Sequence, residues 1–216
     1  AITVNGSGNQ ITNSSTLSPI EIGQTSSNFS ISSNQTLALV GNGIDLNGSV
    51  ISTEGGQIYL TSVTSGLVGI KRTGSGLSLS DNNIIKYQDI NLNQQSLINA
   101  IGEKPGIISL SGKNINLLNA SFILAQNQGN LSGSSLNIKA SEFLTLSGKS
   151  PNNEISSAIR SEVLQTGEAQ GANIIISAQK LQLRDQGQIQ TGSFSESVNG
   201  LGGEININVS DTVDLN

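Results

Sequence analysis

The feature that most constrains this chain is a short phrase of alternating apolar residues that recurs along its length. In the stretch "GIISLSGKNINLLN", apolar residues stand two positions apart, first at Ile108 and Leu110 and then at Ile115 and Leu117. A spacing of two is typical of a strand with one buried face. A few polar residues separate the pairs, which is too few for a helix or a wide hairpin. The phrase therefore predicts several short strands close together in sequence.

Imperfect copies of this phrase return at intervals of about 20 to 40 residues, the range of solenoid repeats. When 106–125 is aligned with 173–192, Ile108 falls on Ile174, and Ile115 falls on Leu181. A third apolar position is expected to follow in each copy. We place it at Val50, at Phe122 and at Ile189. The copies are predicted at 36–53, 57–70, 89–100, 106–125, 135–148, 173–192 and 204–216.

These repeats favour an all-β fold, a right-handed parallel β-helix with about seven imperfect coils and short loop insertions. Three short strands per repeat, separated by turns rich in Gly, Asn, Asp and Ser, would make one triangular coil. Stacked coils would pair equivalent strands in parallel and bury the aligned Ile, Leu and Val residues. An antiparallel sandwich is the alternative, because it also uses short alternating strands. It does not require the same phrase to recur.

The organisation that follows is one β-helical segment, residues 1–216, of a longer protein. Residues 35–216 carry the repeats, and residues 1–34 are expected to form an irregular first coil or a cap. The polar stretches 148–171 and 192–203 are expected to be loop insertions at a corner.

Composition excludes several classes of function. The chain has no His, no Cys and no Met, so it cannot build a Ser-His-Asp triad, a Cys-His dyad or a His- or Cys-based zinc site. A net charge of -5 argues against binding to nucleic acid phosphates. No stretch reaches the 18 or more apolar residues of a membrane-spanning helix.

Candidate chemical residues are sparse, and we predict no catalytic, cofactor-binding or metal-binding residue. Carboxylates are scattered along the chain, and the aligned repeats place Arg184 and Asp185 after a second strand without other acids beside them. In "GNGIDLNG", the alternation predicts that Asp45 is an outward strand residue and not a calcium ligand. The single adjacent basic pair, Lys71 and Arg72, is too small for a basic patch.

Three stretches together resemble a known family. They are "QTLALVGNGIDLNGSVISTEGGQIYLTSV", "GLSLSDNNIIKYQDINLNQQSLINA" and "GIISLSGKNINLLNAS". Their sequence is similar to that of the filamentous haemagglutinin-like exoproteins of cyanobacteria, which belong to the two-partner secretion class. The resemblance runs from about residue 35 to the end of the chain. It implies a β-helical segment of a large protein that is exported by a dedicated outer-membrane partner.

The chain departs from the family in one respect. The secretion domain of the family carries Asn-Pro-Asn motifs near its start, whereas the three prolines here follow Ser18, Lys104 and Ser150. The segment is therefore expected to lie downstream of those motifs or in a later part of the secretion domain.

From the resemblance and the composition together, we expect a non-catalytic structural or adhesive segment, secreted or held at the outer cell surface. The expected partners are the outer-membrane two-partner secretion transporter, for the full-length protein, and surface glycans or other cells. A β-helix polysaccharide lyase or hydrolase is the alternative. Scattered carboxylates and an aromatic content of 3% favour the non-catalytic function.

Overall fold

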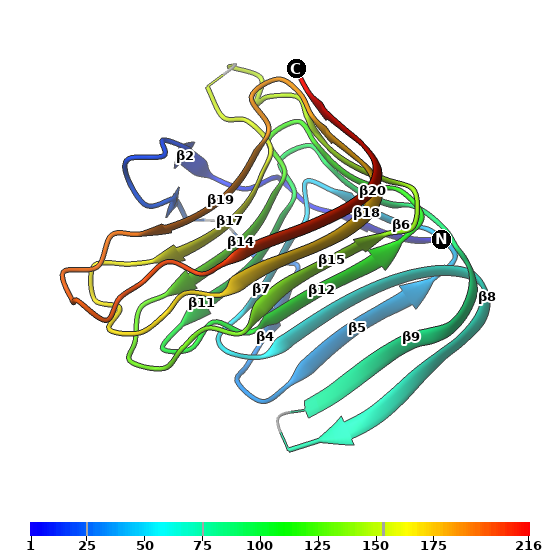
Figure 1. The fold of residues 1–216 in the computed structure, drawn as a ribbon, viewed down its shortest axis with the longest axis horizontal. Coiled ribbons are helices and arrows are strands. Elements are labelled where there is room, and N and C mark those ends of the chain that lie inside the picture. The colour runs from blue at the N-terminus through cyan, green and yellow to red at the C-terminus, as the bar shows by residue number, and fades with distance from the viewer. Residues whose placement is uncertain (25, 75, 153) are drawn as a thin grey trace.

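The computed structural model describes residues 1–24, 26–74, 76–152 and 154–216. Every regular element in these residues is a β-strand, arranged in a twelve-stranded sheet, a six-stranded sheet and a two-stranded sheet. The twelve-stranded sheet is curled, and the six-stranded sheet closes one side of it (Figure 1). The all-β prediction is confirmed.

The strands form three parallel ladders, which the chain visits in turn. Ladder 1 contains β5 (Thr36–Gly41), β8 (Gln57–Thr73), β12 (Ile107–Gly112), β15 (Ser135–Ala140), β18 (Asn173–Leu183) and β20 (Ile205–Leu215). Ladder 2 contains β1 (Ile2–Asn5), β6 (Ile44–Asn47), β10 (Ile90–Asn93), β13 (Ile115–Leu118), β16 (Phe143–Ser147) and the second halves of β18 and β20. Ladder 3 contains β4 (Phe29–Ile31), β7 (Val50–Thr53), β11 (Leu97–Gly102), β14 (Phe122–Asn127), β17 (Ala158–Val163) and β19 (Gln188–Ser193).

Antiparallel pairing in the described residues lies outside the ladders. It joins β2 (Ile11–Asn13) to β3 (Glu21–Ile22), and the second half of β8 to β9 (Gly76–Tyr87), with an isolated bridge between Lys149 and Ser156. Apart from β9, the strands of the two large sheets pair in parallel, so an antiparallel sandwich does not describe them.

The predicted register of ladders 1 and 2 is confirmed. Ile108 pairs with Leu136, and Leu136 pairs with Ile174. In ladder 2, the column runs from Ile115 through Leu144 to Leu181. Equivalent side chains of successive strands thus lie one above another, and they fill a continuous apolar core between the three ladders.

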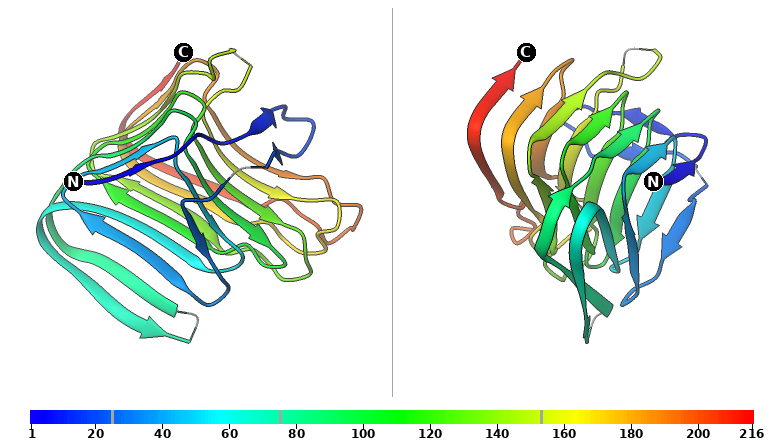
Figure 2. Two further views of the ribbon diagram at one scale, coloured as in Figure 1. Left: turned by 180° about the vertical axis from the view of Figure 1, so that it is seen from behind. Right: turned by 90° about the vertical axis from the view of Figure 1, so that its right-hand side faces the viewer.

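The inward residue of ladder 3 was predicted wrongly in two copies. Ile51, Ile123 and Ile189 belong to the inward column, whereas Val50 and Phe122 face outward. The physical reason is that the inner strands of ladder 3, β7, β11, β14 and β17, are buried on both faces. Its outer face packs against the N-terminal segment, whose Ile11 and Ile20 join a second apolar cluster there. Figure 2 shows this segment crossing the strands of ladder 3.

Two further expectations are corrected. The stretch 148–171 is not a polar loop throughout, because it contains β17, which is buried along its whole length. The stretch 57–70 is not a complete repeat, because the chain leaves ladder 1 after Ser62 and forms the β8–β9 hairpin. It returns at Gln88, whose N–H donates to Ser62 O at 3.0 Å.

A column of four buried serines stands at the corner that precedes ladder 3. Ser49, Ser96, Ser121 and Ser157 each come directly before a ladder 3 strand, and each is fully buried. The Ser96 hydroxyl accepts the N–H of Ser49 at 3.1 Å, Ser121 accepts from Ser96 at 3.2 Å, and Ser157 accepts from Ser121 at 3.3 Å. The hydroxyls of Ser96, Ser121 and Ser157 thus satisfy backbone N–H groups that would otherwise be buried without a partner.

Candidate functional site

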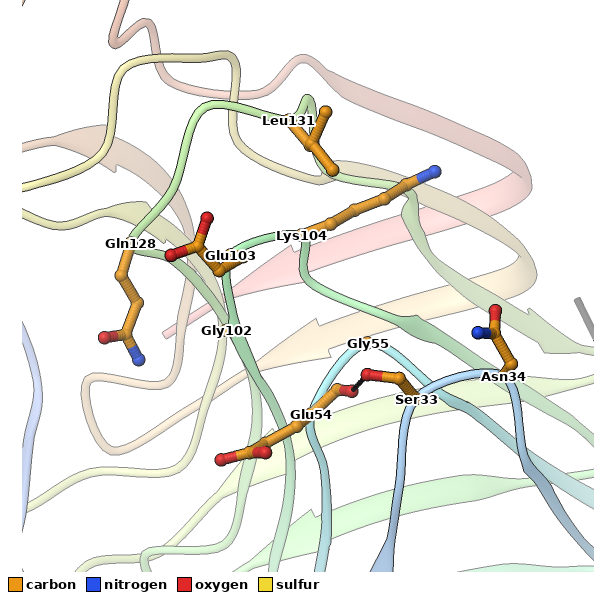
Figure 3. Close-up of a pocket in the computed structure, with 9 residues that line it drawn as sticks. All are labelled: Ser33, Asn34, Glu54, Gly55, Gly102, Glu103, Lys104, Gln128 and Leu131. Atoms are coloured by element: carbon orange, nitrogen blue, oxygen red, sulfur yellow. Dashed lines mark hydrogen bonds between the residues drawn. The ribbon is translucent and has the colours of Figure 1, made fainter.

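The first candidate site is a groove of about 420 Å³ where chain segments pass from ladder 3 to ladder 1. It is shown in Figure 3. The connections after β4, β7, β11 and β14 line it, which places side chains from successive repeats next to one another. Its lining residues are Ser33, Asn34, Glu54, Gly55, Gly102, Glu103, Lys104, Gln128 and Leu131.

The groove is polar and open to solvent. Glu54, Glu103 and Lys104 are exposed, and Lys104 extends away from the Glu103 carboxylate (Figure 3). The Ser33 hydroxyl donates to the backbone O of Glu54 at 2.6 Å, which joins two neighbouring connections. No aromatic side chain lines the groove. Such a surface can accept hydrogen bonds from a hydrated polar ligand, but it offers no ring on which a sugar could stack.

A second, smaller cleft of about 180 Å³ lies between the outer face of ladder 1 and β9 of the hairpin. At its centre, the Asp81 carboxylate accepts from Lys139 Nζ at 2.8 Å and from the Tyr87 hydroxyl at 2.7 Å. The Lys139 ammonium also lies 5.6 Å from the centre of the Tyr87 ring. Tyr59, on β8, lines the same cleft.

The pKa values of this cluster follow from burial and pairing. Burial pushes the pKa of Asp81 upward, but the hydrogen bonds from Lys139 and Tyr87 and the charge of Lys139 outweigh it, so the pKa lies below its ordinary value. Burial lowers the pKa of Lys139, but bonding to Asp81 outweighs it and the pKa is raised. Burial, together with the Asp81 carboxylate, raises the pKa of Tyr87, and burial raises that of Tyr59. The cluster is therefore a stable ion pair at neutral pH.

Arg184 and Asp185, the two charged residues that the sequence analysis considered together, bond to different partners. Arg184 Nη2 pairs with Asp214 at 2.9 Å, whereas the Asp185 carboxylate accepts from the Ser147 hydroxyl at 2.7 Å and from Gly148 N–H at 2.9 Å. The hydrogen bond from Ser147 lowers the pKa of Asp185. These contacts join neighbouring repeats, so both side chains have structural partners.

Asp45 lies on ladder 2 as an outward, half-buried strand residue, as predicted. Its carboxylate accepts from Asn91 Nδ2 at 2.8 Å, and Asn91 accepts in turn from Asn116 Nδ2 at 2.8 Å. Side-chain amides stacked in this way stabilise parallel pairing. Lys71 and Arg72 lie on the hairpin, and both are exposed.

A buried polar cluster on the outer face of ladder 3 was not predicted from the sequence. Arg160 Nη2 contacts Glu162 Oε1 at 2.6 Å, and Arg160 Nη1 donates to the backbone oxygens of Ser14 and Ser15 at 3.2 Å and 3.0 Å. Burial lowers the pKa of Arg160, although the Glu162 charge opposes this effect. The nearest signal is the spacing of two between the charges, which puts both on one face of a strand.

The same cluster holds the N-terminal segment through its backbone. The N–H of Ile20 donates to Glu162 Oε2 at 3.0 Å, and the backbone O of Ile20 accepts from Gln126 Nε2 at 2.8 Å. Gln126 Nε2 also donates to Glu162 Oε2 at 2.8 Å. The cluster is thus a structural clasp between segments far apart in the sequence.

In the part of the chain that the structure describes, no three His, Cys, Asp or Glu side chains gather closely enough to hold a metal ion. The same residues contain no helix of the length and apolarity that crossing a membrane requires. Comparison with protein-family models, with curated proteins and with solved structures finds no match in any of the three.

Proposed function

We propose that this chain is a non-catalytic structural or adhesive segment of a secreted or surface-held protein, built as a right-handed parallel β-helix. The observation that carries the proposal is the unbroken register of ladder 2. Its inward column pairs Ile2, Ile44, Ile90, Ile115, Leu144, Leu181 and Val213 in sequence, without a shift along this column. Parallel strands that repeat in this way build a solenoid, whose outer faces form a long, regular surface.

The polar character of that surface supports an adhesive role. Outward columns such as Asp45, Asn91 and Asn116 consist of short hydrogen-bonding side chains at the spacing of parallel strands, about 4.8 Å. Together with the groove of Figure 3, they suit many weak contacts with hydrated polymers such as surface glycans. Individually weak contacts give useful adhesion when they act together.

The family resemblance extends this proposal to partners and location. A filamentous haemagglutinin-like exoprotein of the two-partner secretion class would be exported by its outer-membrane transporter. Antibodies against the purified segment test the location. We expect them to label intact cells of the source organism, and external protease should remove that label. Labelling that requires permeabilised cells would contradict the proposal.

A separate experiment tests the absence of catalysis. The purified chain is incubated with acidic and neutral polysaccharides, and new reducing ends and unsaturated products are measured. We expect none above background. Turnover that is lost in Asp185→Asn, Arg184→Gln or Asp81→Asn would instead indicate a β-helix polysaccharide lyase or hydrolase.

A further inference from the structure

Two cavities lie next to each other on the outer face of ladder 1. The first is the cleft of about 180 Å³ beneath β9, and the second is an open groove of about 430 Å³ nearer to β20. Lys139 lines both cavities, so they meet at this residue. The other polar residues that line the groove are Ser141, Ser177, Gln179, Asn208 and Ser210.

One column of outward side chains connects the cleft to the groove. It runs through the paired residues of five successive strands, which are Thr61, Ser111, Lys139, Ser177 and Asn208. Thr61 and Ser111 line the cleft, whereas Ser177 and Asn208 line the groove. Because neighbouring strands lie about 4.8 Å apart, the column forms a regular polar track across the sheet.

The polar track ends at β8. On the next strand, β5, the residue paired with Thr61 is Val40. The hairpin strand β9 also crosses this side of the sheet, because the N–H of Leu77 donates to Thr36 Oγ1 at 2.9 Å. Leu79, two residues further along β9, lines the cleft. The cleft is therefore the closed end of the track, and the groove is its open end.

The polar side chains along the track are not used by the fold. In the part of the chain that the structure describes, no hydrogen bond engages the side chains of Thr61, Ser109, Ser111, Ser177 or Asn208. Ladder 2 differs, because its outward amides bond to one another along the column. Thr61 is only 4% exposed, and a hydroxyl at such a site is costly unless water or a ligand pairs with it.

The chemistry of the two cavities fits a neutral sugar. Hydroxyl and amide groups donate and accept hydrogen bonds, as the hydroxyls of a sugar do. Tyr59 also lines the cleft and adds an aromatic surface. Lys139 is already paired with Asp81, so the cleft offers no free cation to an acidic sugar. The volume of the cleft equals that of about six water molecules, which is enough for one sugar ring.

We propose that the cleft and the groove together bind a neutral oligosaccharide by its end. The terminal sugar occupies the cleft beneath β9, where Ser109 and Ser111 bond to its hydroxyls. The following sugars lie in the groove, along the track toward Asn208. Because the polar track stops at β8, the site recognises the end of a glycan and not the middle of one. This site rests on the proposed adhesive function and names its class of ligand.

Tyrosine fluorescence tests the proposal, because Tyr59 and Tyr87 are the only tyrosines and the chain has no Trp. The full chain is titrated with linear glucose oligomers, α-linked and β-linked, and with linear N-acetylglucosamine oligomers, each series beginning at the monosaccharide. We expect at least one series to change the fluorescence. Its affinity should rise with length and level off at about three units, since the groove has room for about two sugars beyond the cleft. A cyclodextrin, which is a closed ring of α-linked glucose without an end, should not bind.

A matched pair of variants tests the residues of the cleft. S109A/S111A removes two hydroxyls that line it and should weaken binding about tenfold or more. The control S30A/S132A removes two exposed hydroxyls that line neither cavity and should bind as the parent chain does. Equal binding by S109A/S111A, equal binding of cyclodextrin, or no binding by any series would overturn the proposal. Adhesion to whole polysaccharides that survives in S109A/S111A would overturn this site and leave the adhesive function intact.

Discussion

Arg160 and Glu162 form an ion pair of 2.6 Å, although both side chains are about 1% exposed. They lie two residues apart on the outer face of β17, and the N-terminal segment covers them. The Nε atom of Arg160 has no hydrogen-bond partner among the described residues. A buried pair of this kind orders two segments in a specific way without adding much net stability.

Replacement of Arg160 or Glu162 alone is therefore expected to lower the free energy of unfolding more than replacement of both. Arg160→Met or Glu162→Leu alone leaves a buried charge and should lower the free energy of unfolding by about 3–5 kcal/mol. The double variant R160M/E162L should be more stable than either single variant. Urea unfolding of the parent chain, the two single variants and the double variant measures these free energies. A loss in the double variant equal to the sum of the two single losses would contradict the prediction.

The direction of side chains on β18 gives a matched test of the core. Ile176 is 1% exposed in the inward column, whereas its neighbour Ile175 is 44% exposed on the opposite face. Ile176→Asp should cost about 4 kcal/mol or more, because a charge is buried without a partner. Ile175→Asp should stay within about 1 kcal/mol. Similar losses in thermal or urea unfolding would disprove the assignment of faces.

The two tyrosines report on the cleft beneath the hairpin. Tyr59 and Tyr87 are the only tyrosines in the chain, and burial raises the pKa of both above the ordinary value of about 10. A raised pKa stabilises the fold below pH 10, and this contribution is lost as the pH rises through the folded-state pKa. Tyrosinate absorbance should appear at higher pH in the native protein than in guanidinium chloride. Superimposable curves would argue against a closed cleft.

Acid should loosen the hairpin through Asp81. Because its pKa is lowered in the fold, its stabilising contribution is present above the unfolded value of about 3.9, and it is lost as the pH falls through the folded-state pKa. The protection factors of the amides in 76–87, which correct for the slower intrinsic exchange in acid, should therefore fall below about pH 4. In Asp81→Asn, they should already be lower at neutral pH and respond less to acid. Asp214→Asn, which disrupts a distant pair, serves as the control.

The ladders should fold without the hairpin. When 63–87 is deleted, Ser62 joins Gln88 and forms a corner of the same length as the one after Gly112. We expect an unchanged sheet content by circular dichroism, a single melting transition and a moderate loss of stability, since Tyr59 is uncovered. An unfolded product would show that the insertion is part of the core.

Ladders 1 and 2 were predictable because each has one buried face. Ile108 and Leu110 alternate with polar residues, so the two-residue period of the strand and the side chains that point inward follow from the sequence. The inner strands of ladder 3 are buried on both faces, and they contain apolar runs such as Leu97–Ile98 and Phe122–Ile123. Such runs indicate a strand but not which residue points inward, so Phe122 was placed on the wrong face.

The Arg160–Glu162 clasp and the β8–β9 hairpin were not predicted from the sequence, for different reasons. Arg160 and Glu162 look like exposed residues of a polar loop, because the segment that covers them lies more than a hundred positions away. In the hairpin, Leu67 and Ile70 imitate a repeat, but a strand face requires even spacing, and these two stand three apart. Arg184 and Asp185 lie after the second half of β18, as the aligned repeats predicted, but the pairing of Arg184 with Asp214, like that of Asp81 with Lys139, needed three-dimensional contacts.

The serine column has a consequence for how such a chain can change in length. The hydroxyls of Ser96, Ser121 and Ser157 each bond to the preceding serine of the column, so the residue directly before a ladder 3 strand has a fixed position in these repeats. The number of residues before that position can vary: Lys149 forms a bridge with Ser156, and Ser157, the next residue, continues the column. Natural insertions should therefore accumulate upstream of these serines, and a single residue added between Ser121 and Phe122 should be tolerated far less well than several added before Ser121.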